Sequence, residues 1–145
     1  MATALQLKAL ANERITEAEI LLGNSKHEGV FYLAGYAVEF ALKAVICVRL
    51  DIEIYDQSSK SNPKDVSAKV YGAFLTHNLR DLLILSGLKR QLEKEQIIDP
   101  NFATAWSEVS LWNEQRRYDS GCTEKVANGF LSDAKTLLAW ISKYW

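Results

Sequence analysis

The sequence predicts an all-α protein, an up-and-down bundle of four main helices accompanied by shorter helices. Apolar residues recur at helical spacing along most of the chain, and no segment alternates convincingly between apolar and polar residues as a strand does. Only two prolines and seven glycines interrupt the 145 residues, which leaves room for long helices. Because no linker separates two cores, we expect residues 1–145 to form a single domain.

Start and stop signals mark the first two helices. Thr3-x-x-Gln6 has the spacing of a capping box and predicts a helix over residues 4–23, which Gly23-Asn24 ends. Ser25-x-x-Glu28 has the same spacing and predicts a second helix over residues 26–50. Because the connection between them is so short, we expect the two helices to lie antiparallel.

The middle of the chain predicts a loop and three short helices. Residues 51–65 are polar and predict a flexible loop. Residues 66–75 and 88–96 predict short helices, the second of them rich in charge. Between these two, Asn78 has the chemistry of an N-cap, and Gly87 has that of a helix end.

The C-terminal part predicts two further helices. Asp99-Pro100 places a capping residue before a proline at the first helical position, which is a strong start signal. The last helix should begin near Thr123. The apolar stripes of the two helices are, in order, Phe102, Ala105, Trp106, Val109 and Trp112, and then Val126, Phe130, Ala134, Leu137, Ile141 and Tyr144.

Composition excludes some classes of function. Lys plus Arg is 17 and Asp plus Glu is 18, for a formal net charge of −1, which excludes a globally basic nucleic-acid coat but leaves room for a local basic patch. Cys47 and Cys122 are too few for a disulfide framework or a zinc cluster, and neither belongs to a CxxC motif. We therefore expect a reducing, cytoplasmic compartment and no bound metal or cofactor.

The most apolar stretch, residues 30–50, is long enough to span a bilayer. Glu39, Lys43 and Arg49 would be costly in lipid, so we expect a buried helix of a bundle and no membrane association; the N-terminus also lacks the pattern of a signal peptide. A helix that is apolar nearly all round is either central in its own bundle or shared with a second subunit, and the sequence leaves both alternatives open.

Arg14 is the most conspicuous charge. At 100° per residue it lies at the middle of the apolar stripe of the first helix, where an unpaired charge is expensive. Glu39 in the second helix is a candidate partner, and Lys43 follows it by four residues, the favourable order. We expect Arg14, Glu39 and Lys43 to form a buried ion-pair network that docks the two helices; the alternative is a polar pocket for phosphate or substrate.

Two further places carry candidate functional residues. Paired arginines suit phosphate recognition, so Arg116 and Arg117, with Tyr118, are candidate binding residues; the alternative is a solvated helix end. His77 precedes the Asn78 cap and is the candidate catalytic histidine, although a structural or surface role is the alternative. No metal-ligand spacing, phosphate loop or nucleophile motif accompanies these residues.

Several segments resemble the HEPN family, the nucleotide-binding domains found in higher eukaryotes and prokaryotes. The resemblance rests on four elements between residues 9 and 118: Ala9-Leu10-Ala11-Asn12-Glu13-Arg14, Tyr32 to Ala44 with Glu39 and Lys43, His77-Asn78-Leu79, and Arg117-Tyr118. It implies a small all-α bundle that is usually a homodimer. Many relatives are metal-independent ribonucleases, often the toxins of toxin–antitoxin systems that pair with a small nucleotidyltransferase.

The ribonuclease signature of that family is Arg, four to six residues, then His. Here the positions that would hold this Arg are Ile20-Leu21-Leu22 before His27 and Val70-Tyr71-Gly72 before His77, so the signature is absent. We therefore interpret the chain as a HEPN-like module, without ribonuclease activity, that binds RNA, a nucleotide or a partner such as a nucleotidyltransferase. The alternative is a ribonuclease with a displaced site, in which His77 acts with Arg80, Arg116 or Arg117 as the phosphate contact.

Overall fold

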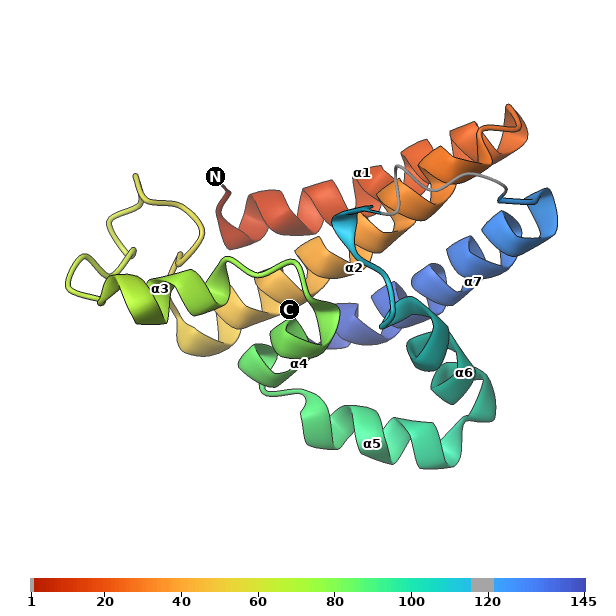
Figure 1. Ribbon diagram of the computed structural model, residues 1–145. Helices are drawn as coiled ribbons and strands as arrows, with labels where there is room; N and C mark the ends of the chain where they lie inside the picture. Colours follow the sequence, from red (N-terminus) through yellow and green to blue (C-terminus); the bar gives the residue numbers. More distant parts are fainter. Residues whose placement is uncertain (1, 116–121) are drawn as a thin grey trace.

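The computed structural model describes residues 2–115 and 122–145, and its architecture is all-α (Figure 1). Within these residues the backbone forms helices and their connections, with no strand. The predicted fold class is therefore confirmed. The elements are α1 (Ala4–Gly23), α2 (His27–Leu50), α3 (Ala68–Phe74), α4 (Leu79–Ser86), α5 (Lys89–Ile98), α6 (Pro100–Val109), α7 (Glu124–Ile141) and the short 3₁₀ helix η2 (Ser142–Tyr144).

Helices α1 and α2 form the predicted antiparallel pair (Figure 1). The Thr3 capping box is present, because the Thr3 hydroxyl accepts from the Gln6 N–H and the Gln6 side chain accepts from the Thr3 N–H. The second predicted box is wrong. Ser25 has a positive φ of 58° and lies in the turn, and α2 begins after Lys26 without a side-chain cap. Ser25, which the spacing predicts as the N-cap of α2, is therefore a residue of the tight turn before that helix.

Helix α2 is the centre of the molecule, with α1 on one side and α7 on the other (Figure 1). It is the one helix of the described chain that is long and apolar enough to cross a membrane, and 72% of that window is buried inside the protein. Burial against α1, α4 and α7 accounts for most of its all-round apolar character. The exception is one side, where Tyr32, Leu33, Tyr36 and Phe40 are only partly buried.

The predicted loop over residues 51–65 is present, since no helix lies between Leu50 and Ala68, and hydrogen bonds and buried side chains attach it to the rest of the protein. Ile54 and Tyr55 are almost fully buried, with 1% and 2% exposure. The Asn62 side chain donates to the backbone carbonyls of Glu53 and Ile54, and the Glu53 carboxylate accepts from the Ala4 N–H at the start of α1. Sequence reasoning missed this packing because two apolar residues in a polar run carry no periodic signal.

The remaining predicted helix starts agree with the structure, but α6 ends at Val109, so Trp112, which the sequence places in its apolar stripe, lies after the helix. The Asn78 side chain accepts from the N–H groups of Arg80 and Asp81 and so caps α4, which Gly87 ends with φ of 74°. Asp99 caps α6 with Pro100 at its first position, and Thr123 caps α7. These caps place the N-terminus of α4, and therefore His77 just before it, against the middle of α2.

Candidate functional site

The candidate site is built around Glu39, a carboxylate in the middle of α2 with 0% exposure. Its Oε2 accepts from Lys43 Nζ at 3.1 Å, and its Oε1 lies 2.9 Å from His77 Nδ1. The Glu39–Lys43 pair is the predicted one. Each carboxylate oxygen therefore has a partner, which a buried charge requires.

Arg14 does not belong to this network, and that prediction is wrong. Its Nη2 lies 3.3 Å from Glu13 Oε2 and 3.3 Å from Glu17 Oε1, both on its own helix. The Cα of Arg14 is on the apolar side of α1, but the long side chain carries the guanidinium away to the half-exposed acids. The second partner of the Glu39 carboxylate is therefore His77, and not Arg14 as the sequence predicted.

His77 is held by two interactions of the short connection between α3 and α4. Thr76 Oγ1 accepts from the N–H of Asn78, and the Asn78 side chain caps α4, so the backbone on the C-terminal side of His77 is fixed. An ionised carboxylate can only accept, so Nδ1 of His77 carries the proton of the bond to Glu39. The side chain is 43% exposed, which leaves Nε2 as the nitrogen that can exchange a proton or bind a ligand.

Tyr36 connects His77 to an aromatic surface. Its ring meets the His77 ring edge-on at 6.2 Å between centroids and the Trp112 ring edge-on at 5.1 Å. On the same side of α2, one turn away in each direction, lie Tyr32 at 4.9 Å and Phe40 at 5.5 Å. We call Tyr32, Tyr36 and Phe40 the aromatic face.

The aromatic face is partly open to solvent. Together with Leu33 and Arg14 it lines a hollow of about 250 Å³. Burial, and then a hydrogen bond with Tyr32, raises the pKa of Tyr36 well above its usual range. The Tyr36 hydroxyl therefore stays protonated at neutral pH and remains able to donate a hydrogen bond.

Lys43 is the buried end of the network that His77, Glu39 and Lys43 form. It is 9% exposed, and its Nζ lies 5.1 Å from the centroid of the Tyr55 ring, within the range of a cation–π interaction. The Tyr55 ring comes from the loop after α2, so that loop shields the ion pair from water. The Glu39 carboxylate and the Lys43 ammonium compensate one another's charge inside the protein.

The other predicted site residues lie elsewhere or outside the described residues. Arg80 is exposed in the first turn of α4, one turn after His77. Arg116, Arg117 and Tyr118 fall in the segment that the structure does not describe. His27 lies at the start of α2, far along the helix from Glu39, with a buried Nε2 that has no hydrogen-bond partner.

Within residues 2–115 and 122–145, no group of three or more His, Cys, Asp and Glu side chains could hold a metal ion. The candidate site offers the oriented imidazole of His77, the protonated phenol of Tyr36 and a flat aromatic surface. Sequence reasoning found Glu39 and His77 separately, but it could not join them because they are 38 positions apart in the chain. No family model, no curated protein and no solved structure matches this chain.

Proposed function

We propose that this chain is a HEPN-like module that binds a nucleotide or a short single strand of RNA on the aromatic face. The observation that carries the proposal is the placement of His77 against Tyr36, with Tyr32 and Phe40 continuing the same partly exposed surface. Aromatic side chains accept a nucleobase by stacking, and an oriented imidazole suits a phosphate or a hydroxyl group.

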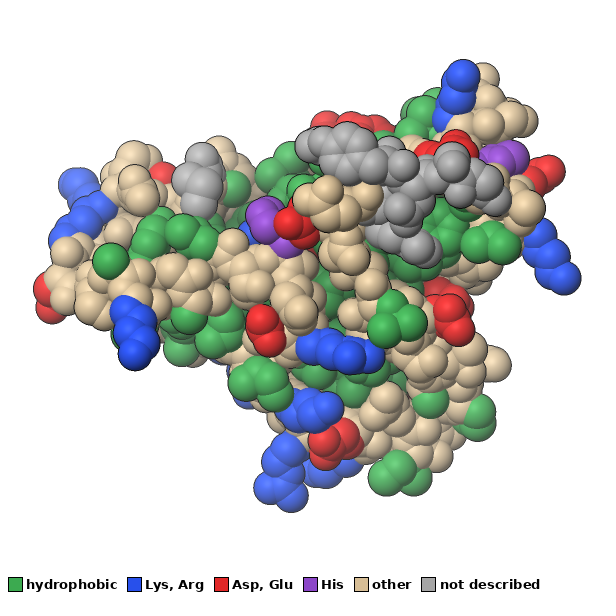
Figure 2. Space-filling model, viewed as in Figure 1, with side chains coloured by type: hydrophobic (Ala, Val, Ile, Leu, Met, Phe, Trp, Pro, Cys, Tyr) green, Lys and Arg blue, Asp and Glu red, His purple; other side chains and the backbone are tan. Residues whose placement is uncertain are grey.

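The surface charge argues for a short ligand. On the side drawn in Figure 2, basic and acidic side chains are interspersed, and no continuous basic track crosses the molecule. Binding would then depend on stacking and hydrogen bonds more than on counterion release, so its salt dependence should be shallow. Arg80, Arg116 and Arg117 stay the proposed phosphate contacts.

The binding test uses a labelled RNA oligonucleotide of mixed sequence and AMP as a competitor, followed by fluorescence polarisation. Phe40→Ala and Tyr36→Ala should weaken binding by about 5- to 100-fold, because stacking is worth ~1–3 kcal/mol per base. The matched control is Ile97→Ala on α5, which removes an apolar side chain that is 84% exposed. Equal affinity in the parent and both aromatic variants would contradict the proposal.

A second candidate function is metal-independent RNA cleavage, and one observation favours it. The buried Glu39 carboxylate orients His77 through Nδ1 and leaves Nε2 for the proton transfer that cleavage needs. Here His77 would be the base or acid, and Arg80, Arg116 or Arg117 the phosphate contact. The absence of the Arg-x4–6-His signature is the reason why we place this activity second.

The cleavage test is incubation of the purified protein with mixed RNA in EDTA. Cleavage by the parent that disappears in His77→Ala and falls in Glu39→Gln would establish His77 as a catalytic residue and overturn the non-catalytic proposal. RNA retention without cleavage would support the binding module. If the protein neither retains nor cleaves RNA, the proposal fails, and a protein partner is the remaining interpretation.

The resemblance also carries proposals about assembly. We propose a homodimer that works beside a nucleotidyltransferase in a toxin–antitoxin setting. Because most of α2 is buried within one chain, its apolar character no longer supports a dimer by itself, and the partly exposed aromatic face is the part that remains. Light scattering at micromolar concentration tests the dimer, and a monomer mass there would contradict it. Identifying the protein that the neighbouring gene encodes tests the association, because we expect a nucleotidyltransferase there.

A further inference from the structure

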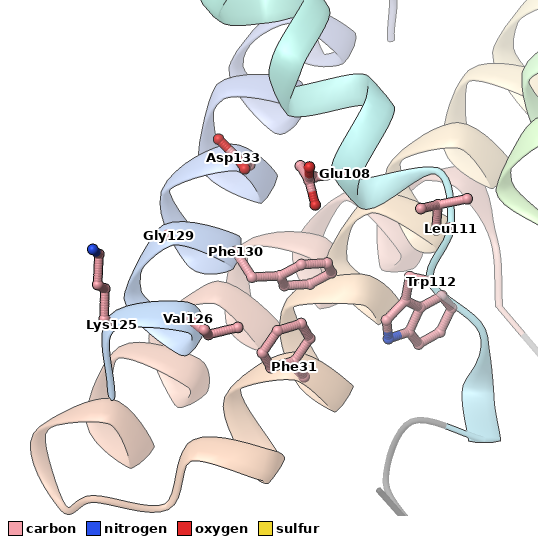
Figure 3. A pocket seen from close by; sticks show the side chains of 9 residues that line it. All are labelled: Phe31, Glu108, Leu111, Trp112, Lys125, Val126, Gly129, Phe130 and Asp133. Carbon is pink, nitrogen blue, oxygen red and sulfur yellow. The ribbon is translucent and has the colours of Figure 1, made fainter. Parts of the chain in front are cut away.

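A second hollow lies on the other side of Trp112, between α6 and α7, and Figure 3 shows it from close by. We call it the α6–α7 pocket; its volume is about 550 Å³. Its floor is apolar, because the rings of Phe31 and Phe130 stack there at 4.4 Å between centroids. The residues that line it are Phe31, Glu108, Leu111, Trp112, Lys125, Val126, Gly129, Phe130 and Asp133.

Two carboxylates stand at one end of this pocket, Glu108 from α6 and Asp133 from α7 (Figure 3). Neither makes an ion pair with any of the residues that the structure describes. Burial, and then the charge of Glu108, raises the pKa of Asp133. Two acids at the same end of an apolar pocket, close enough for the charge of one to raise the pKa of the other, favour a positive charge beside them.

Lys125, the basic residue that lines the pocket, does not supply the positive charge beside the two acids. Lys125 precedes Asp133 by eight residues on α7, which is roughly 12 Å at 1.5 Å per residue. Figure 3 shows Lys125 at the opposite rim from the two acids. The pocket therefore has a negative end, an apolar middle and a separate positive rim.

Gly129 leaves the middle of the pocket open. It lies in the interior of α7, and a Cβ added there would meet nothing within 4 Å. Glycine in a helix interior costs about 1 kcal/mol relative to alanine, and no contact with the residues that the structure describes requires it at this place. The Trp112 indole forms part of the wall, and its Nε1 is buried without a hydrogen-bond acceptor.

We propose that the α6–α7 pocket binds a small organic cation with an aromatic or branched apolar body. The body lies on Phe31 and Phe130, and the ammonium group lies between Glu108 and Asp133. The volume falls within the range of small-ligand sites, roughly 300–1,000 Å³. An anion would meet the two acids, and a neutral apolar molecule would leave both of them without a partner, so the cation is the occupant that the charges select.

The probe for this proposal is 2-phenylethylamine, with 2-phenylethanol as its neutral match. Both are titrated into the isotopically labelled full chain, and backbone amide shifts are followed by NMR. We expect saturable shifts confined to the residues near 31, 108–112 and 125–133, which line the pocket. The amine should bind about tenfold more tightly than the alcohol, because hydrogen bonds to a charged group are the stronger ones.

Four variants make the test specific. Asp133→Asn and Glu108→Gln should each weaken amine binding about tenfold and leave binding of the alcohol unchanged. Gly129→Leu should abolish binding of both probes by filling the pocket, while the melting temperature holds or rises because leucine favours the helix. Lys125→Gln is the matched control, since it removes a rim charge of the opposite sign and should leave amine binding equal or slightly tighter.

Three outcomes would overturn the proposal. The first is the absence of saturable shifts at millimolar amine. The second is equal affinity for amine and alcohol, which would leave an apolar hollow without selection for charge. The third is amine binding that persists in Gly129→Leu, which would place the probe elsewhere on the protein.

Discussion

A Cβ atom added to Gly35 would lie 2.0 Å from Cε2 of Trp112, so the indole rests directly on the backbone of α2. Trp112 is 3% exposed, and its ring meets the Tyr36 ring edge-on at 5.1 Å between centroids. The ring therefore has little freedom to move. This contact fixes the wall that separates the aromatic face from the α6–α7 pocket.

The first prediction follows from this contact. Gly35→Ala should lower the free energy of unfolding by about 1–3 kcal/mol, because a methyl group must displace a tightly packed indole. Urea denaturation measures the change. Gly129→Ala is the matched control, since it meets open space in a helix interior, and it should raise stability by about 0.5–1 kcal/mol. Equal effects of the two substitutions would contradict the packing.

The second prediction concerns the buried ion pair. Glu39→Ala should cost about 3–5 kcal/mol, because it leaves the Lys43 ammonium buried without its partner. The double variant Glu39→Met with Lys43→Met should be much less damaging, since apolar residues of similar volume replace both charges. Thermal and chemical denaturation of both proteins check this. A double variant as unstable as Glu39→Ala would show that cavity formation, and not the stranded charge, causes the loss.

The third prediction concerns Tyr55, whose buried hydroxyl has no hydrogen-bond partner. Tyr55→Phe keeps the ring beneath Lys43 and removes the unsatisfied group, so stability should hold or rise by about 1 kcal/mol. Tyr71→Phe is the control, because the Tyr71 hydroxyl accepts from Gln57 Nε2 at 3.1 Å and loses that bond. Chemical denaturation compares the two. A clear loss in Tyr55→Phe would mean that the hydroxyl has a partner in solution.

The fourth prediction concerns alkaline pH. Burial, and then the charge of Glu53, raises the pKa of the Cys47 thiol from 9.0 to about 11. The unfolded chain therefore releases this proton first, so the stability that it contributes is complete below pH 9.0 and is lost as the pH rises to about 11. Burial raises the pKa of Tyr55 as well, which adds a further loss above pH 10.

Denaturation curves between pH 8 and pH 10 measure this effect, and Cys47→Ala is the variant that isolates the thiol. Its stability should fall less steeply with pH than that of the parent, even though it starts lower because of the smaller side chain. Identical slopes in the two proteins would exclude Cys47 as the titrating group.

The helix boundaries were largely predictable because capping is a local interaction. Thr3, Asn78 and Asp99 each cap a helix whose first residues follow at once, so the pattern and its partner lie within one turn. Ser25 shows the limit of this reasoning. Ser25 has the spacing of a capping box. The three-residue connection to α2 requires a left-handed residue at this position, however, so Ser25 lies in the turn and does not cap the helix.

The candidate site was only half predictable. A lone carboxylate in an apolar helix must have a partner, and its own helix supplied Lys43 by the i,i+4 rule. The choice between Arg14 and His77 for the second oxygen depends on which element packs where. Arg14 has acids on its own helix within reach, whereas His77 is carried to Glu39 by the docking of α4 on α2.

The sequence by itself thus determined the all-α class, the helix ends set by short-range hydrogen bonds, and the need to satisfy a charge at position 39. Only the tertiary structure decided that His77 meets Glu39, that Trp112 lies on Gly35, and that Glu108 and Asp133 lie at the same end of an apolar pocket. The reason is physical. Periodicity and caps are written within a few neighbouring residues, whereas these contacts join residues 25 to 77 positions apart through the packing of whole helices.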